Sequence, residues 1–215
     1  MPVYKKSIET KQRIIDATIA LTLEKGYANF GIKDITDRLE MPRSLVYYYY
    51  KNKDDIMQDI YISVYQRLTD TATRLTQNHN NPLVLIMVKY ILNFRFIVQS
   101  EVLGDYFFSR PLYVSEGRRA IEKAMDTCYE CSKEAFEYFH MDADIAQFYA
   151  FVVTSDSLMR ALFEGLLNGT LTMSLRELIM YFGERAIMIP FNLSHDEFSE
   201  IVDKAFALTD TVANL

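Results

Sequence analysis

The sequence is poor in glycine, proline and cysteine and contains no tryptophan: its 215 residues include 7 Gly, 5 Pro and 2 Cys. Folds built from many short strands need frequent turns, and glycine and proline supply most of these turns. Their scarcity argues against a sandwich or barrel and favours long helices. Because half of the residues are apolar, the chain can bury a sizeable core, so disorder is not expected.

Long apolar runs are also lacking. The most apolar stretch, residues 82–96, contains Lys89 and Arg95 and falls short of the ~18 uninterrupted apolar residues of a membrane span. Near the N-terminus, Lys5 and Lys6 are followed by polar residues and not by the apolar core of a secretory signal. We therefore expect a cytoplasmic protein that does not enter a membrane.

Patterns typical of catalysis and metal binding are missing as well. The sequence has no phosphate-binding glycine loop, no G-x-S-x-G turn and no histidine placed to pair with an acid and a nucleophile. Cys128 and Cys131 form a C-x-x-C pair, but a structural zinc needs four ligands. The histidines lie in separate segments, at His79, His140 and His195. We predict ordinary reduced thiols, no metal, no cofactor and no enzymatic activity.

The net charge of -6 argues at first against nucleic acid as a partner. The charge is unevenly distributed, however: residues 1–53 carry 10 Lys and Arg against 6 Asp and Glu, whereas residues 54–215 carry 13 against 23. Fields between exposed charges decay over ~8 to 10 Å at physiological salt, so an acidic body does not cancel a basic N-terminal part. The first 53 residues can therefore attract phosphates.

Apolar residues spaced three and four apart predict an all-α fold of about ten helices. Gly26 ends the first helix, Pro42 begins the third, and Asn52 caps a long fourth helix that links the two parts of the chain. Ser174 and Ser194 each precede a glutamate by three residues, which is the pattern of a capping box. The predicted helices cover residues 7–25, 31–39, 42–49, 52–76, 83–100, 102–109, 115–139, 142–168, 174–189 and 194–212. We expect a DNA-binding domain over 1–53 and a second helical domain over 54–215.

The segment of residues 35–50 has the layout of a helix-turn-helix, in which the second of two crossing helices enters the DNA major groove. Val46 and Tyr50 are one turn apart and are predicted to pack inward. Successive side chains of a helix are 100° apart, so at least two of the four tyrosines at 47–50 must face outward. Exposed tyrosines beside Arg43 suggest an interface, although the alternative is that the run fills a core.

Residues 10–57 resemble the tetracycline repressor (TetR-like) family in spacing and residue type. The resemblance is carried by Arg13, Ile14, Ala17, Glu24, Lys25, Gly26, Tyr27, Ile35 and the run Leu45, Val46, Tyr47, Tyr48, Tyr49, Tyr50, Lys51, Asn52, Lys53. It implies an N-terminal three-helix head and a C-terminal bundle that binds a ligand and dimerises. The chain departs from the family pattern at Phe30 and Gly31, which replace hydroxyl residues. It departs again at Glu40, which replaces a turn glycine and needs a left-handed backbone if the turn is conventional.

The resemblance also implies which side chains contact double-stranded operator DNA. Arg43, Ser44, Leu45 and Tyr47 occupy positions that often contact base edges, and Tyr48, Tyr49 and Lys53 occupy positions that often contact phosphates. The chemistry agrees, because Arg43 can donate two parallel hydrogen bonds to guanine and Lys53 places a charge at a helix N-terminus. We predict a bacterial transcriptional regulator, a repressor in preference to an activator, that a small molecule releases from a palindromic operator.

Residues 54–215 are rich in large, adaptable side chains, which suit a pocket between helices for a small apolar or aromatic ligand. The predicted pocket residues are Phe94, Tyr106, Phe107, Met125, Tyr129, Phe151 and Met159. Core packing is the alternative for each of them, because a helical bundle without tryptophan fills its core with the same residue types.

A two-fold operator requires a two-fold protein, and the family pattern implies a homodimer that pairs through the helices near residues 142–168 and 194–212. A helix buried inside one subunit is the alternative for the first of these. Two other functions stay open from the sequence: an all-helical small-molecule binding protein without operator specificity, and a helical enzyme whose site is assembled from distant residues.

Overall fold

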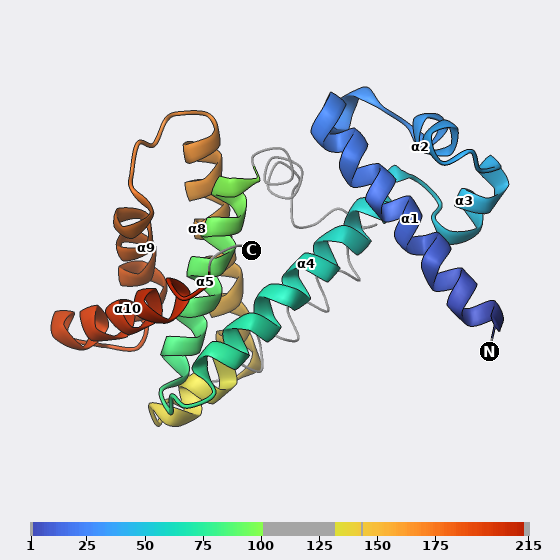
Figure 1. The fold of residues 1–215 in the computed structure, drawn as a ribbon. Coiled ribbons are helices and arrows are strands. Elements are labelled where there is room, and N and C mark those ends of the chain that lie inside the picture. The colour runs from blue at the N-terminus through green and yellow to red at the C-terminus, as the bar shows by residue number, and fades with distance from the viewer. Residues whose placement is uncertain (1, 101–131, 143, 213–215) are drawn as a thin grey trace. The chain divides into compact units, whose positions relative to one another are not determined.

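The computed structural model describes residues 2–100, 132–142 and 144–212, and all regular elements within these ranges are helices (Figure 1). The predicted all-α fold is therefore confirmed. The predicted helix at 102–109 and most of that at 115–139 lie outside the described residues. The contacts divide the chain into two compact units, Met1–Val64 and Tyr65–Leu215, and the division falls inside helix α4 (Lys53–Thr76).

Unit 1, residues 1–64, is built from α1 (Pro2–Lys25), α2 (Ile32–Leu39), α3 (Arg43–Tyr49) and the start of α4. The three predicted helices are confirmed, and α1 begins earlier than the predicted residue 7. Gly26 has a φ of 76°, which glycine adopts without strain, and it turns the chain from α1 into the short 3-10 helix Tyr27–Asn29. The apolar faces of all four helices supply the buried core: Ile14, Leu21, Ile35, Val46, Met57.

The turn between α2 and α3 passes through Glu40, whose φ of 52° and ψ of 41° lie in the left-handed region. The backbone N–H of Met41 donates to the carbonyl of Thr36 at 3.0 Å, and that of Glu40 donates to Asp37 at 3.4 Å. These two bonds make the turn a Schellman motif, which closes a helix and favours glycine at the left-handed position. The left-handed backbone predicted for Glu40 is confirmed.

Replacing Glu40 by glycine should raise the free energy of unfolding by about 0.5 to 1 kcal/mol, because glycine adopts the left-handed region without the Cβ clash of other residues. Glu40→Gln is the control, because it removes the charge of the side chain and keeps a residue with a Cβ at the left-handed position. Denaturant titration should show a gain for glycine alone, and equal stabilities for the two variants would contradict this reading of the turn.

Unit 2, residues 65–215, places α5 (Pro82–Gln99) against α9 (Leu175–Gly183) and α10 (His195–Thr209). Helix α8 (Ile145–Leu167) contacts α9 and the π-helical turn Glu184–Met188 that follows it. The Arg95 guanidinium of α5 donates to the Thr209 carbonyl at 2.7 Å and also pairs with Asp210. The Thr209 carbonyl also accepts from the Val212 N–H at 3.1 Å, so the α5 side chain adds a second donor to a carbonyl at the end of α10.

Three helices of unit 2, α8, α9 and α10, begin with a capping box. Ser174 accepts from the Glu177 N–H and Ser194 from the Glu197 N–H, while each glutamate accepts from the serine in return. These hydrogen bonds from serine lower the pKa of Glu177 and of Glu197. Both predicted capping boxes are confirmed. Asp144 caps α8 in the same way, so that helix begins later than the predicted residue 142.

None of the described helices is both long and apolar enough to cross a membrane. Among the same residues, no three His, Cys, Asp or Glu side chains gather as they would around a metal ion. Cys128 and Cys131 lie outside the described residues, so the structure says nothing of their thiols.

Candidate nucleic-acid interface

The inner side of α3 anchors the helix in the core of unit 1. Val46 is fully buried, and Tyr50, the residue that ends the helix, is 4% exposed. The backbone N–H of Tyr50 donates to the Val46 carbonyl at 3.0 Å, so the two residues stand one turn apart as the spacing predicts. The inward packing predicted for both residues is confirmed.

The outer side of α3 is open to solvent. Tyr48 is 79% exposed and Tyr47 is 53% exposed, and Arg43, Ser44 and Leu45 are exposed as well. The requirement that at least two tyrosines face outward is therefore met. Tyr47 and Tyr48 leave much of their ring area open to solvent in the free protein, where their rings and hydroxyls can contact thymine methyls and phosphates. We refer to Arg43, Ser44, Leu45, Tyr47 and Tyr48 as the outer face of α3.

Tyr49 lies between these two sides and is half-buried. Its hydroxyl donates to the Ser7 hydroxyl of α1 at 3.2 Å, and its ring packs edge-on against the Tyr48 ring at a centroid distance of 5.0 Å. Tyr49 thus connects the end of α3 to the first turns of α1. Its predicted contact with phosphate stays a prediction.

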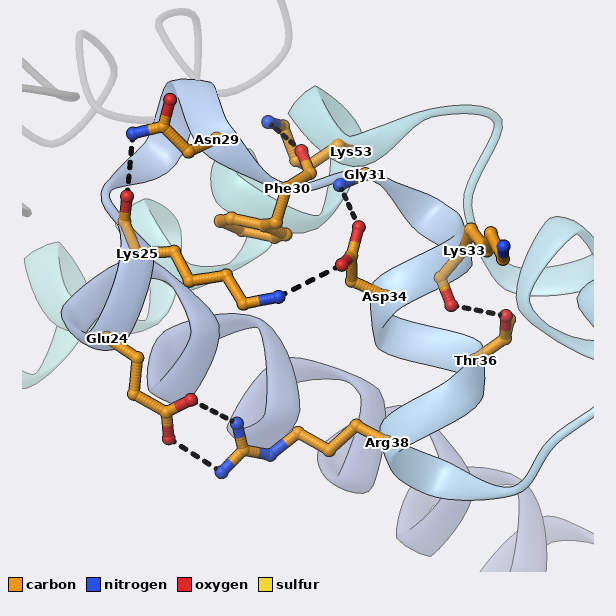
Figure 2. A network of polar contacts seen from close by, with 10 residues as sticks. All are labelled: Glu24, Lys25, Asn29, Phe30, Gly31, Lys33, Asp34, Thr36, Arg38 and Lys53. Carbon is orange, nitrogen blue, oxygen red and sulfur yellow. Dashed lines mark hydrogen bonds and ion pairs between the residues drawn. The ribbon is translucent and has the colours of Figure 1, made fainter.

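Two ion pairs hold α2 against the end of α1 (Figure 2). The Arg38 guanidinium donates two parallel hydrogen bonds to the Glu24 carboxylate, at 2.7 and 2.8 Å, and this contact lowers the pKa of Glu24. Asp34 accepts from the Gly31 N–H at 2.9 Å and from Lys25 at 3.0 Å, and these contacts lower the pKa of Asp34. Gly31 precedes α2 at a position where the family pattern has a hydroxyl residue. The Asp34 carboxylate, in the third position of α2, satisfies the Gly31 backbone N–H.

Lys53, the first residue of α4, reaches the segment between α1 and α2. Its ammonium donates to the Phe30 carbonyl at 2.7 Å (Figure 2). It also donates to the Tyr27 carbonyl at 2.5 Å. It also lies 3.9 Å from the centroid of the Tyr27 ring and 4.5 Å from that of Phe30. Two backbone carbonyls and two aromatic faces therefore surround the cation, which gives it a structural role that the sequence does not reveal.

The predicted ligand residues fall into separate places. Phe94 is fully buried on α5, and its ring lies 4.4 Å from Phe163 and 5.8 Å from Phe182. Phe151 of α8 belongs to a different aromatic cluster, with Phe136 and Phe191 each 5.6 Å away. Met159 is half-buried on α8. The other predicted pocket residues lie outside the described residues: Tyr106, Phe107, Met125 and Tyr129.

The sequence analysis missed the residues that tie α3 to its neighbours. Asp59 of α4 accepts a hydrogen bond from the Tyr50 hydroxyl at 3.0 Å and pairs with Lys11 of α1 at 2.5 Å. Nothing in the spacing of Asp59 distinguishes it from an ordinary exposed acid of a long helix. Its contacts exist only because the fold brings the start of α1 and the end of α3 together.

Comparison with known proteins gives one family and many related structures. Residues 14–60 match the family described as bacterial regulatory proteins, tetR family. This match covers α2, α3 and most of the described core of unit 1. No curated protein matches the chain.

Solved structures resemble nearly the whole chain at low sequence identity. RolR bound to resorcinol is 13% identical with a TM-score of 0.71, covering 93% of this chain and 95% of RolR. FadR of Thermus thermophilus, a TetR family repressor bound to lauroyl-CoA, is 17% identical with a TM-score of 0.70, covering 82% of this chain and 93% of FadR. SmeT, the repressor of a Stenotrophomonas maltophilia multidrug efflux pump, is 18% identical with a TM-score of 0.60, covering 83% of this chain and 89% of SmeT. These chains share one fold across both units.

Proposed function

Because residues 14–60 match the tetR family of bacterial regulatory proteins, we propose that the chain is a transcriptional repressor and not an enzyme. In this proposal a dimer binds a palindromic operator through the outer face of α3 of each subunit. A small molecule bound in unit 2 then releases the dimer from DNA.

The observation that carries the DNA-binding proposal is the two-sided character of α3. Its inner side is held by Val46 and Tyr50, while its outer side presents an arginine and two tyrosines to solvent. Arg43 stands in the first helical turn, where a recognition helix approaches the bases. We propose base-edge contacts for Arg43, Ser44, Leu45 and Tyr47, and phosphate contacts for Tyr48 and Tyr49.

Lys53 was predicted to contact a phosphate, and its contacts within unit 1 indicate a structural role as well. A lysine ammonium has three donors, and two of them go to the carbonyls of Tyr27 and Phe30. We propose that Lys53 acts first by holding the start of α4 against the segment that leads into α2. Contact with a phosphate would be additional to this role.

The dimer proposal is supported by a stripe of small residues along α8. The exposed positions of this stripe recur at spacings of three and four: Ala146, Ala150, Thr154, Ser157, Ala161. Apart from Leu167 at the end of the helix, the larger apolar side chains of α8 whose burial is described are buried or half-buried within the subunit. The small side chains can therefore let a second helix approach closely. We propose that α8 pairs with its two-fold copy, together with α10.

Ser157→Arg tests the dimer, because it places a long charged side chain in the middle of this stripe. The variant should sediment as a monomer and lose operator binding, since half-sites about 34 to 36 Å apart need two linked heads. Arg74→Ala, a change of an exposed charge on α4, serves as a control that should stay dimeric. A dimer that persists in Ser157→Arg would contradict the assignment of α8.

The ligand proposal is a small apolar or aromatic compound in unit 2. Structural relatives with the same fold are described in complex with resorcinol, which has an aromatic ring, and with lauroyl-CoA, which has a long apolar acyl chain. Phe94, Phe151 and Met159 are the described residues that we propose for the pocket, and ordinary core packing is the competing role. A ligand can shift the DNA-binding equilibrium only by its difference in affinity for the two states.

Selection of bound duplexes from a random pool tests the function. The proposal expects a palindromic winner whose binding weakens steeply with salt, followed by its displacement on addition of one class of metabolite. A protein that enriches no duplex at low salt would contradict the regulator. A protein that enriches a palindrome and responds to none of a wide set of apolar compounds would contradict only the ligand class.

A further inference from the structure

A polar cluster of three side chains, Lys11, Tyr50 and Asp59, joins three helices of unit 1. One carboxylate oxygen of Asp59 on α4 accepts from the Tyr50 hydroxyl at 3.0 Å and lies 2.5 Å from the Lys11 ammonium of α1. That ammonium also lies 5.4 Å from the centroid of the Tyr50 ring. Each member comes from a different element, so the cluster fixes the end of α3 relative to α1 and α4 at one point.

The partner of Asp59 in α3 is part of the core. Tyr50 is 4% exposed, so its ring cannot move without disturbing the packing around it. Burial, followed by the charge and hydrogen bond of Asp59, raises the pKa of the Tyr50 hydroxyl well above its usual range. The hydroxyl is therefore protonated at neutral pH and can donate to Asp59.

A small change in the tilt of α3 at its Tyr50 end is enough to displace the other end of the helix, where Arg43 lies. The helix spans seven residues, Arg43–Tyr49, which is about 10 Å at a rise of ~1.5 Å per residue. A tilt of about 10° at the Tyr50 end would move Arg43 by roughly 2 Å, which is enough to break a bidentate hydrogen bond to a base. General attraction to phosphates is far less sensitive to such a shift, because it depends weakly on orientation.

We propose that Asp59 is a positioning residue for the recognition helix, and that by binding Lys11 and Tyr50 together it sets the base specificity of the protein while leaving its general affinity for DNA unchanged. This inference rests on the proposed function, since it assumes that the outer face of α3 contacts base edges.

Two variants test the role of Asp59. Asp59→Asn keeps the size of the side chain and removes the charge that binds Lys11, and Tyr50→Phe keeps the buried ring and removes the hydroxyl. Glu24→Gln is the matched control, because it breaks an ion pair between α1 and α2 that does not involve α3. Each full-length protein is titrated, at one salt concentration, with the duplex that the wild type selects from a random pool and with an unrelated duplex of equal length.

The measured quantity is the ratio of the two affinities, alongside the free energy of unfolding. We expect Asp59→Asn and Tyr50→Phe to lower the ratio about tenfold, as for the loss of one good base contact, with binding to the unrelated duplex unchanged within about twofold. Glu24→Gln should keep the wild-type ratio. A residue with only a structural role would lower stability and leave the ratio of the folded protein unchanged.

The outcomes separate this inference from the proposed function. If both variants lose stability and keep the wild-type ratio, Asp59 has no positioning role and the regulator stands. If Asp59→Asn fails to fold, Tyr50→Phe decides the question by itself. If the wild type binds every duplex equally, the outer face of α3 does not contact base edges specifically, and both the proposed function and the positioning role of Asp59 are contradicted.

Discussion

Replacing Lys53 by methionine should lower the free energy of unfolding of unit 1 by about 3 to 6 kcal/mol, because two hydrogen bonds from a charged donor are lost at ~1.5 to 3 kcal/mol each, together with the cation–π contacts. Methionine keeps most of the apolar stem but leaves the carbonyls of Tyr27 and Phe30 without the ammonium. Phe30 is buried, so water replaces that donor poorly.

Denaturant titration followed by circular dichroism measures this loss. Lys33→Met is the matched control, because Lys33 is exposed on α2 and a surface substitution changes stability by less than ~0.5 kcal/mol. If Lys53 served only as a phosphate contact, the variant would keep its stability, and the salt dependence of DNA binding would fall by about one unit. That second pattern would contradict the structural role given to Lys53.

Replacing Gly183 by alanine should lower the free energy of unfolding of unit 2 by about 1 to 3 kcal/mol, the usual cost of overpacking a core. A Cβ at this position would lie 2.6 Å from Cζ of Phe198, 2.8 Å from its Cε2 and 3.2 Å from Cε of Met87. Phe198 and Met87 are both fully buried, so neither can move without disturbing other core residues. The clash outweighs the gain of ~1 kcal/mol that alanine brings to a helix.

Gly165→Ala provides the comparison for this prediction. A Cβ at Gly165 would lie 2.6 Å from Cδ1 of Leu171, which is a similar overlap. Leu171 is half-buried in the connection between α8 and α9, so it can shift toward solvent. We expect a clearly smaller loss for Gly165→Ala in the same thermal or denaturant assay. Equal losses for the two variants would mean that Phe198 is not the rigid neighbour that the structure indicates.

Local rules of helix geometry predicted several features of both units. The period of the α-helix placed Val46 and Tyr50 inward and required outward tyrosines, and the structure has both. The two serine capping boxes and the left-handed Glu40 were also predicted, since each depends on residues within one turn of the chain. Such signals are readable because the interacting atoms are neighbours in sequence.

The contacts that fix α3 and α4 could not be predicted in this way. Lys53 binds carbonyls more than twenty residues earlier in the chain, and backbone carbonyls carry no sequence signal of their own. Asp59 likewise acquires its role from Lys11 and Tyr50, which approach it only in the folded protein. The physical reason is that long-range polar contacts depend on the packing angle between helices, and composition does not specify that angle.

The ligand residues show a second limit of the sequence. Phenylalanine and methionine serve equally well in a core and in a pocket, so composition could not separate the two roles. Phe94 and Phe151 were predicted together but belong to different aromatic clusters of unit 2. Phe94 is in close contact with the rings of Phe163 and Phe182. The assignment of Phe94 and Phe151 to a ligand pocket stays a prediction.

The measurement that tests the account most directly is a comparison of the base preferences of the wild type and of Arg43→Ala, each taken through the same selection from random duplexes. The account predicts that Arg43→Ala still selects the same palindrome but loses its preference at one symmetric pair of base positions, by about 1 to 3 kcal/mol each. Identical preferences at every position would show that the outer face of α3 does not read bases, and would contradict the recognition mechanism proposed for this regulator.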